Sequence, residues 1–487
     1  MLTRRQFSAG AVTLAASSVL AAAAERPRYT TRLAPPADVG PGTTVRVQLT
    51  AAERPTALSC FGGRPLPMWT FTEGAWPPVV RLNIGDELQA TLENRLPRPD
   101  ESTSIHWHGI RLPNDQDGVP HLVQPPVNVG ETFHYRFTPP DCGTYFFHTH
   151  CNTVEQLGRG LQGTLIIDGD AVDSYDADVV LLMRDWIIDP DTGQFASFFT
   201  LRGAGRAGTY GTLRTVNGMV NPEILLPAAG DCRLRLINSD PTRIMKIGVK
   251  GADAAIIAID GIAVPPFPLT LWEMGPAMRI DLALRAPQDG GRASLFDISQ
   301  SASAPRELAY FKGQGFSRRT SKFDPAPLRA SRIPEPDLNN ATRLNFIFDA
   351  TDSGQALLEA TDVLGALLSS LCLSAKTFWT INERAWPDQK NPKLPAPFAV
   401  LDRGASYVFR MTNKSQFSHP IHIHGHTFKL LGSNKQSLPT HHMDTLLLLP
   451  EETAEVAFVA DNPGDWMFHC HVIEHQETGM MGYFRVA

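Results

Sequence analysis

Three stretches of the chain share one pattern of hydrophobic and polar positions. Each has a short apolar run, a turn that contains glycine, and a second run that alternates up to an asparagine, over residues 78–94, 222–238 and 398–413. Alternation with a period of two predicts strands with one buried face, and glycine turns separate such strands. The repeat predicts an all-β chain of three β-sandwich domains in tandem.

Composition shifts suggest where these domains meet. An acidic, turn-rich stretch at residues 169–178 separates the first repeat from the second, and a basic, proline-rich stretch at residues 315–338 precedes the third. Stretches of this kind are typical of surface linkers. The predicted divisions are residues 25–170, 171–315, a linker over 316–340, and 341–487. Leucines spaced over residues 356–371 predict the only long helix.

Overall composition indicates a globular protein and excludes one class of partner. The chain has 487 residues, 43% of them hydrophobic, which is enough for several folded cores. The formal net charge is -6, and the chain after its N-terminal segment has no basic cluster. We therefore expect no nucleic-acid partner.

The first residues predict export. Arg4 and Arg5 precede the uncharged, alanine-rich stretch 9–24, which closes with small residues. This arrangement is typical of a twin-arginine signal, so we expect residues 1–24 to be removed, the twin-arginine export machinery to be a partner, and the folded protein to be periplasmic. An uncleaved anchor is the alternative, but the stretch is short for a membrane span. No later segment predicts stable membrane insertion.

The C-terminal run from His469 to Met480 carries the side chains that hold copper for electron transfer. It contains a thiol at Cys470, imidazoles that include His475, and a thioether at Met480. A thiolate, imidazoles and a weak axial thioether form a blue-copper site. If residues 468–472 form a strand, Cys470 faces one way while His469 and His471 face the other. One strand could then serve two metal sites.

Further histidines occur in pairs separated by one residue. The pairs are His106 and His108, His148 and His150, and His422 and His424, with His419 just before the last pair. A single pair on a strand is usually a surface or hydrogen-bonded pair. Several pairs, one with a cysteine between its members, instead indicate a copper centre. Zinc is the competing metal, but the set is too large for one closed structural zinc site.

The chain resembles the multicopper oxidase family, in its three-domain laccase-like branch, because all four of these motifs stand in the family's order. The resemblance implies three cupredoxin-like Greek-key sandwiches and four copper ions. It implies a type 1 copper on His419, Cys470, His475 and Met480, and a type 2 copper on His106 and His422. It implies a type 3 pair on His108, His148 and His471 for one ion and on His150, His424 and His469 for the other.

The resemblance also implies the reaction. A reductant would give single electrons to the type 1 copper, and the other three ions would reduce O2 to water. Asp117 matches a family position that relays protons, with an Asp-Gly turn as the alternative interpretation. In many bacterial members a glutamate that also relays protons stands at the position that Gln476 occupies here. Glu477 or Glu474 would substitute for it.

With Cys470 assigned to copper, an odd number of other cysteines remains, namely Cys60, Cys142, Cys151, Cys232 and Cys372.

The substrate is predicted from what the motifs lack. Family members that oxidise cuprous ion carry a methionine-rich insert, whereas the 12 methionines here form no such run. Phenols and aromatic amines are therefore favoured over cuprous ion, although another metal ion stays open as the reductant. An exposed edge of His475 or His419 would accept the electron. Asp444 could orient the donor, with an N-terminal turn residue as the alternative interpretation. A cuprous oxidase and a copper-free cell-envelope scaffold are the alternatives, and the scaffold would lack several of these ligands.

Overall fold

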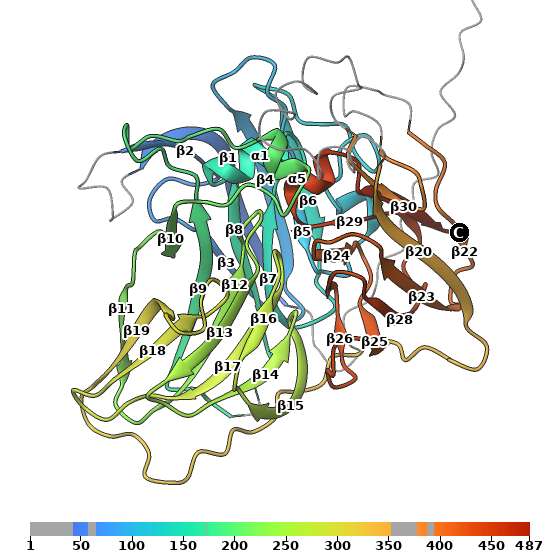
Figure 1. Cartoon of the computed structure of the whole chain (residues 1–487). Coiled ribbons are helices and arrows are strands. Elements are labelled where there is room, and N and C mark those ends of the chain that lie inside the picture. The colour runs from blue at the N-terminus through green and yellow to red at the C-terminus, as the bar shows by residue number, and fades with distance from the viewer. Residues whose placement is uncertain (1–41, 57–64, 172, 352–376, 387–393) are drawn as a thin grey trace, which may run out of the picture.

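The computed structural model describes residues 42–56, 65–171, 173–351, 377–386 and 394–487. Within these ranges the chain is almost entirely β-structure, arranged in six sheets that pack in pairs (Figure 1). No helix of these ranges has the length and apolar character needed to cross a membrane. The signal of residues 1–24 and the helix expected over residues 356–371 lie outside the described residues.

The first sandwich pairs the sheet β2-β1-β4-β6 with the sheet β3-β8-β7-β5. Strand β4 shows why these residues form a sandwich, because its side chains alternate between buried and half-buried positions along its length. The elements are β1 (Thr44–Thr56), β2 (Leu66–Thr70), β3 (Val79–Asn83), β4 (Glu87–Arg95), β5 (His106–His108), η1 (Asn114–Gln116), β6 (Thr132–Phe137), β7 (Gly143–His148), α1 (Thr153–Arg159) and β8 (Gln162–Asp168).

The middle sandwich pairs the sheet β10-β9-β12-β17-β14-β15 with the sheet β11-β19-β18-β13-β16. Its elements are β9 (Ala177–Trp186), α2 (Leu201–Ala204), β10 (Leu213–Val216), β11 (Glu223–Pro227), β12 (Asp231–Asn238), β13 (Met245–Lys250), β14 (Ala254–Ile259), β15 (Ile262–Pro268), β16 (Trp272–Met274), β17 (Arg279–Arg285), β18 (Arg292–Asp297) and β19 (Arg306–Gln314).

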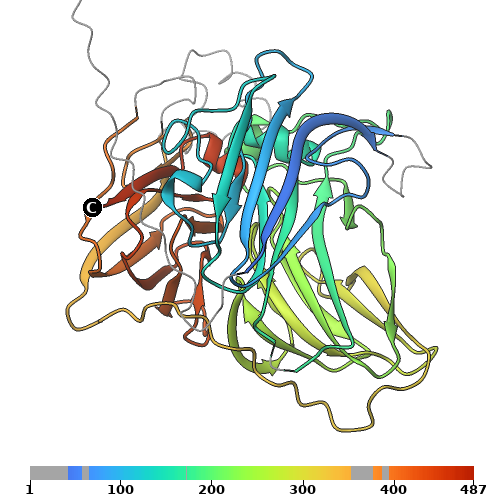
Figure 2. The same ribbon diagram turned by 180° about the vertical axis from the view of Figure 1, so that it is seen from behind.

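The last sandwich pairs the sheet β21-β20-β23-β28-β25-β26 with the sheet β22-β30-β29-β24-β27. Its elements are β20 (Thr342–Ala350), β21 (Trp379–Ile381), β22 (Val400–Leu401), β23 (Ser406–Asn413), β24 (His419–Ile423), β25 (Phe428–Ser433), β26 (His442–Met443), β27 (Thr445–Leu448), β28 (Thr453–Val459), β29 (Gly464–Cys470), α5 (Ile473–Glu477) and β30 (Met481–Val486). Both views show the first sandwich, coloured blue to teal, beside the orange-to-red last one (Figures 1 and 2).

The sequence repeat corresponds to one structural unit in each sandwich. Its two strands are β3 and β4, β11 and β12, or β22 and β23, and in each case they belong to opposite sheets. The asparagines that end the three repeats are Asn94, Asn238 and Asn413, and all are buried. Each donates hydrogen bonds from its side-chain amide to two backbone carbonyls at 2.7–2.9 Å. The repeated asparagine therefore holds the same corner three times, because each buried amide joins two separate stretches of backbone.

The all-β sandwich prediction is confirmed, and the cysteines add no cross-link in the part of the chain that the structure describes. Cys142, Cys151 and Cys232 are free there, while Cys60 and Cys372 lie outside it. Burial raises the pKa of the Cys151 thiol to about 12, so this side chain remains a neutral thiol next to His150.

Candidate metal centre

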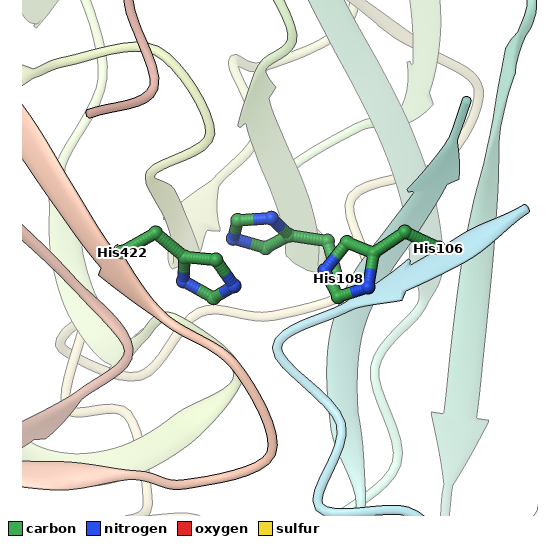
Figure 3. Close-up of side chains that lie close together, drawn as sticks. All are labelled: His106, His108 and His422. Atoms are coloured by element: carbon green, nitrogen blue, oxygen red, sulfur yellow. The ribbon is translucent and has the colours of Figure 1, made fainter. Parts of the chain in front are cut away.

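The predicted ligands stand on two sheets that face each other across the junction of the first and last sandwiches. Strand β5 carries His106 and His108, and it pairs with β7 so that His106 lies opposite His148. Strand β24 carries His422, which lies opposite His469 of β29. Figure 3 shows the rings of His106 and His108, on the blue strand, turned toward that of His422 on the strand of the last sandwich.

The junction brings all eight histidines of the four pairs into one buried cluster. The rings of His106 and His424 stack at 3.8 Å between centroids, and those of His108 and His422 also stack at 3.8 Å. His148 and His471 approach to 5.1 Å, and His150 and His469 to 5.4 Å. Each of these contacts joins the first sandwich to the last, so neither sandwich alone forms the cluster.

Most rings are held by one nitrogen while the other points inward. Backbone carbonyls accept a hydrogen bond from Nδ1 of His106, His148, His422 and His469 at 2.8–3.0 Å, and a carboxylate accepts one from Nδ1 of His424. Among the described residues, no hydrogen-bond partner is found for the buried Nε2 of His106, His150 and His422 or Nδ1 of His108 and His471. Unpaired nitrogens are costly when buried, so this cluster fits metal ions.

Electrostatics at the cluster also suits metal binding. Burial lowers the pKa of His148 well below its usual value, and the neighbouring His106 lowers it further. The same two causes, burial and neighbouring histidines, lower the pKa of His150 and His424. These three imidazoles are therefore neutral at ordinary pH, which is the form that binds metal.

A second group of ligand types lies on the other side of strand β29. Cys470 Sγ is 3.5 Å from His419 Nδ1 and 3.7 Å from His475 Nδ1, and the two histidine nitrogens are 3.1 Å apart. Met480 is fully buried, and its backbone carbonyl accepts a hydrogen bond from the Cys470 backbone nitrogen at 3.0 Å. Burial raises the pKa of the Cys470 thiol well above its usual range, so a bound cation is required to favour the thiolate.

The structure corrects the expectation that an imidazole edge at this second group is exposed. His419 and His475 are both 0% exposed. The Nε2 atom of His475 lies 2.5 Å from the Arg206 carbonyl oxygen, just after helix α2 of the middle sandwich. Trp379 packs on the same ring, at 4.6 Å between centroids. The edge is buried because the middle sandwich covers it, and an internal repeat cannot reveal such a contact between domains.

Two of the predicted proton-handling residues lie beside the histidine cluster. Asp117 is fully buried after helix η1, and its Oδ2 accepts a hydrogen bond from His424 Nδ1 at 2.8 Å. Glu477 accepts one from the Thr153 backbone at 3.1 Å and lines a cavity of about 920 Å³ together with Gln476 and His150. Asp117 thus contacts the cluster, whereas Glu477 stands in the cavity that reaches it.

Glu474 lies elsewhere. Its carboxylate accepts hydrogen bonds from the Thr200 backbone at 3.0 Å and from the Thr209 side chain at 2.9 Å, both in the segment that covers His475. It therefore connects helix α5 to the middle sandwich and does not face the histidine cluster.

Asp444 is buried between β26 and β27, a place that fits the turn interpretation and not contact with an external donor. Its Oδ1 is 3.1 Å from His108 Nε2, and both of its oxygens accept hydrogen bonds from Arg279 at 2.9 and 2.6 Å. Burial opposes its ionisation, but the Arg279 charge outweighs this effect and holds the pKa of Asp444 below its usual range. The sequence carries no motif that links Arg279 to this site.

Comparison with known proteins agrees with the geometry. Two family models, both described as multicopper oxidase, match residues 55–172 and 373–487. The chain is 28% identical to multicopper oxidase MmcO of Mycobacterium tuberculosis, over 90% of this chain and 86% of that protein. Laccase-3 of Botryotinia fuckeliana is 27% identical over 84% of this chain and 99% of its own length.

Solved structures give the same result. The multi-copper oxidase of Pseudomonas thermotolerans is 37% identical and superposes with a TM-score of 0.79 over 91% of this chain and 99% of its own. That of Pseudomonas parafulva is 36% identical, with a TM-score of 0.77 over 90% and 100%. Identity at this level over a whole relative, together with the buried histidine cluster, shows that the chain belongs to the multicopper oxidases, oxidoreductases that use oxygen and four copper ions.

Proposed function

We propose that the predicted ligands divide among the four ions as the family pattern implies. The type 1 copper would bind His419, Cys470, His475 and Met480, and the type 2 copper His106 and His422. One type 3 ion would bind His108, His148 and His471, and the other His150, His424 and His469. The observation that carries this proposal is the set of buried imidazole nitrogens without protein partners, which converge across the junction of two sandwiches.

The close groups of ligand atoms support parts of this division. Cys470 with His419 and His475 forms one such group, and His108 with His148 and His471 forms another. Other groups combine His106 with His108 and His422, or with His150 and His424. This mixing is expected where three sites share one cluster, since His106 stacks directly on His424.

The chain's own residues provide the connection between the two redox sites. Cys470 belongs to the proposed type 1 site, and its neighbours His469 and His471 belong to the oxygen-reducing cluster. Cys470 ends strand β29 and is joined through the backbone to both His469 and His471, so a few covalent bonds span the distance between the sites. Copper supplies the one-electron chemistry when it is bound, and this backbone link is the route that we propose for electrons.

We propose Asp117 and Glu477 as the residues that handle protons. Asp117 accepts a hydrogen bond from the His424 ring at 2.8 Å, so a proton that this carboxylate takes up is held beside the cluster. Glu477 is in the cavity that borders His150, where it can exchange protons with water. Gln476, beside it, has no titratable group.

The proposed reductant is a phenol or aromatic amine. Because His475 is covered by the Arg206 carbonyl and by Trp379, electrons would enter through the covering segment and not by direct contact with the imidazole. Electron transfer through the covering segment suits soluble one-electron donors. A cuprous oxidase that serves copper tolerance is the alternative, and the substrate assay below distinguishes the two.

The test is oxygen uptake by the copper-loaded protein with phenols, aromatic amines, cuprous and manganous ions as separate reductants. We expect the largest kcat/KM with an electron-rich phenol, and no uptake when Cys470 is replaced by serine. A kcat/KM that is highest for cuprous ion would reject the phenol proposal, while a lack of uptake with every reductant would reject the ligand assignment.

We also propose that the chain comprises a twin-arginine signal over residues 1–24, sandwiches over 25–170, 171–315 and 341–487, and a linker over 316–340. The strands support these divisions, since β9 begins at Ala177 and β20 at Thr342. The signal predicts a periplasmic enzyme delivered by the twin-arginine machinery. Replacing Arg4 and Arg5 by lysine should leave the protein in the cytoplasm, which cell fractionation would reveal.

A further inference from the structure

All three sandwiches meet at one point beside the histidine cluster. His108 comes from the first sandwich, Arg279 and Asp260 from the middle one, and Asp444 from the last, and all are buried. The backbone of Gly109 passes so close that a Cβ there would lie 2.4 Å from Arg279 Nη2 and 2.5 Å from Asp444 Oδ2. The middle sandwich, which holds none of the proposed ligands, thus reaches the ligand shell.

All three nitrogens of the Arg279 guanidinium donate hydrogen bonds at this junction, and these bonds fix its position. Its two terminal nitrogens donate to Asp444 Oδ1 at 2.9 Å and Oδ2 at 2.6 Å, the paired geometry in which arginine binds a carboxylate most specifically. Its other donations go to backbone carbonyls at 3.0–3.2 Å, on Thr144, Ala277 and Asp260. The planar fork can therefore hold Asp444 in one orientation only.

Asp260 fixes the backbone next to Asp444. It lies in the turn between β14 and β15 with a φ of 48°, and its Oδ2 accepts hydrogen bonds from the Asp444 and Thr445 backbone nitrogens at 3.2 and 3.1 Å. Its Oδ1 accepts one from the Arg279 backbone at 2.9 Å. Asp260 and Arg279 together hold both the main chain and the side chain of Asp444.

Asp444 in turn determines which nitrogen two histidines present to the cluster. Its carboxylate accepts from Nε2 of His108 at 3.1 Å, which leaves Nδ1 of His108 facing inward. Its carbonyl accepts from Nδ1 of His422 at 2.8 Å, which leaves Nε2 facing inward. His108 therefore presents the opposite nitrogen from that of His422, and a carboxylate is what selects it.

We propose that Arg279 is a positioning residue of the oxygen-reducing centre: through Asp444 it fixes the ring orientation and tautomer of His108 and His422, so that the middle sandwich controls copper binding at the junction of the other two. This proposal rests on the ligand set proposed above. Groups that orient a metal-binding histidine typically change metal affinity by about 10- to 100-fold when removed.

The experiment compares Arg279→Gln and Arg279→Lys with the same two substitutions at Arg214. Arg214 is another buried arginine of the middle sandwich, and its carboxylate partner at 2.7 Å is Asp185, which is not Asp444 of the cluster. Copper per chain is measured after dialysis against graded chelator concentrations. Electron paramagnetic resonance reports the type 2 ion, and the blue absorption reports the Cys470 site.

We expect Arg279→Gln to lose cluster copper at a chelator concentration about 10- to 100-fold lower than wild type while the blue absorption persists. Arg279→Lys should be intermediate, because lysine keeps the charge without the fork. Both Arg214 variants should hold cluster copper as wild type does. If Arg279→Gln does not fold, the same measurement of copper per chain on Arg279→Lys and Asp444→Asn tests the proposal.

Two results would overturn the positioning role. One is cluster affinity within about twofold of wild type in both Arg279→Lys and Asp444→Asn. The other is equal loss of the blue site and the cluster, which would indicate a general effect on folding. A wild-type protein that binds no cluster copper would instead reject the ligand set itself, so the two failures are distinguishable.

Discussion

Single residues decide which ring nitrogen of each histidine is available to metal. The ligand residues themselves could be predicted, because spacing along strands places them on a common face. Their partners could not be predicted, since most are backbone carbonyls such as Asp117 O and Cys470 O, which carry no sequence signal. The place of Asp444 in the site could not be predicted either, because only the folded chain brings Arg279 to it.

Replacing Cys470 by serine tests the separation of the two metal sites. The thiolate supplies the blue colour, so the variant should lose this absorption and its oxidase activity with phenols. The cluster should keep its copper, because His469 and His471 project from the opposite face of β29. Absorption spectroscopy and copper analysis measure both effects. A wild-type protein that is colourless when fully loaded would contradict the type 1 assignment.

Replacing Met480 by leucine tests the axial ligand. The side chain is fully buried, and leucine has a similar volume, so the fold should tolerate the change. Loss of the weak thioether should leave a blue oxidase with a higher reduction potential. Redox titration of the blue band measures the shift. Loss of both colour and copper would mean that Met480 is more than an axial ligand.

Replacing Asp117 by asparagine tests proton delivery. The variant should slow reoxidation of the reduced enzyme by oxygen by at least about 100-fold, the lower range for loss of a general acid or base. Reduction by substrate should keep its wild-type rate, since Asp117 lies beside His424 and not at Cys470. Stopped-flow measurement separates the half-reactions. The matched variant Gln476→Glu adds a carboxyl beside the cavity and should be neutral or faster.

At the scale of elements, short segments between strands shape the sites. The strand repeat was predictable from alternation, and the structure shows that its two strands enter opposite sheets. Helix α2 and the segment after it were not predicted as parts of a copper site, because nothing in residues 200–209 resembles a ligand motif. Their position over His475 follows from Glu474, which accepts the Thr200 and Thr209 hydrogen bonds.

Replacing Glu474 by alanine should loosen this cover. Removal of the acceptor leaves buried donors unpaired, which costs about 1–3 kcal/mol of stability. The covering segment should then open more often, so that bulky phenols reduce the type 1 site faster while small donors change little. Rates of anaerobic bleaching of the blue band with a graded series of phenols measure this. Equal changes for small and bulky phenols would show that the segment does not restrict access.

At the scale of the whole molecule, the cluster depends on two sandwiches that are distant in sequence. The family resemblance predicts a site shared between the outer domains, because it assigns His106 and His422 to the same ion. The ion pairs between the first and middle sandwiches were not predicted. An example is Arg235 of β12, which pairs with Asp168 of β8 at 3.2 Å and also bonds to Thr144 of β7 at 3.0 Å. Charge composition cannot distinguish such pairs from exposed ones.

Copper removal should therefore weaken the attachment of the last sandwich to the first. Ions that bind only the folded junction stabilise it by mass action, by about 2.7 kcal/mol for each ion at 100 times its dissociation constant. Calorimetry should show a lower melting temperature for the copper-free protein, and a proteolysis series should show faster cleavage in residues 315–341, which connect β19 to β20.

The matched comparison uses Cys470→Ser, which should retain cluster copper without type 1 copper. Because the cluster joins two sandwiches while the Cys470 ligands belong to one, this variant should keep most of the copper-dependent rise in melting temperature. His106→Ala with its blue site intact should lose most of it. The opposite ranking of the two variants would mean that the type 1 site, and not the shared cluster, links the folding of the outer sandwiches.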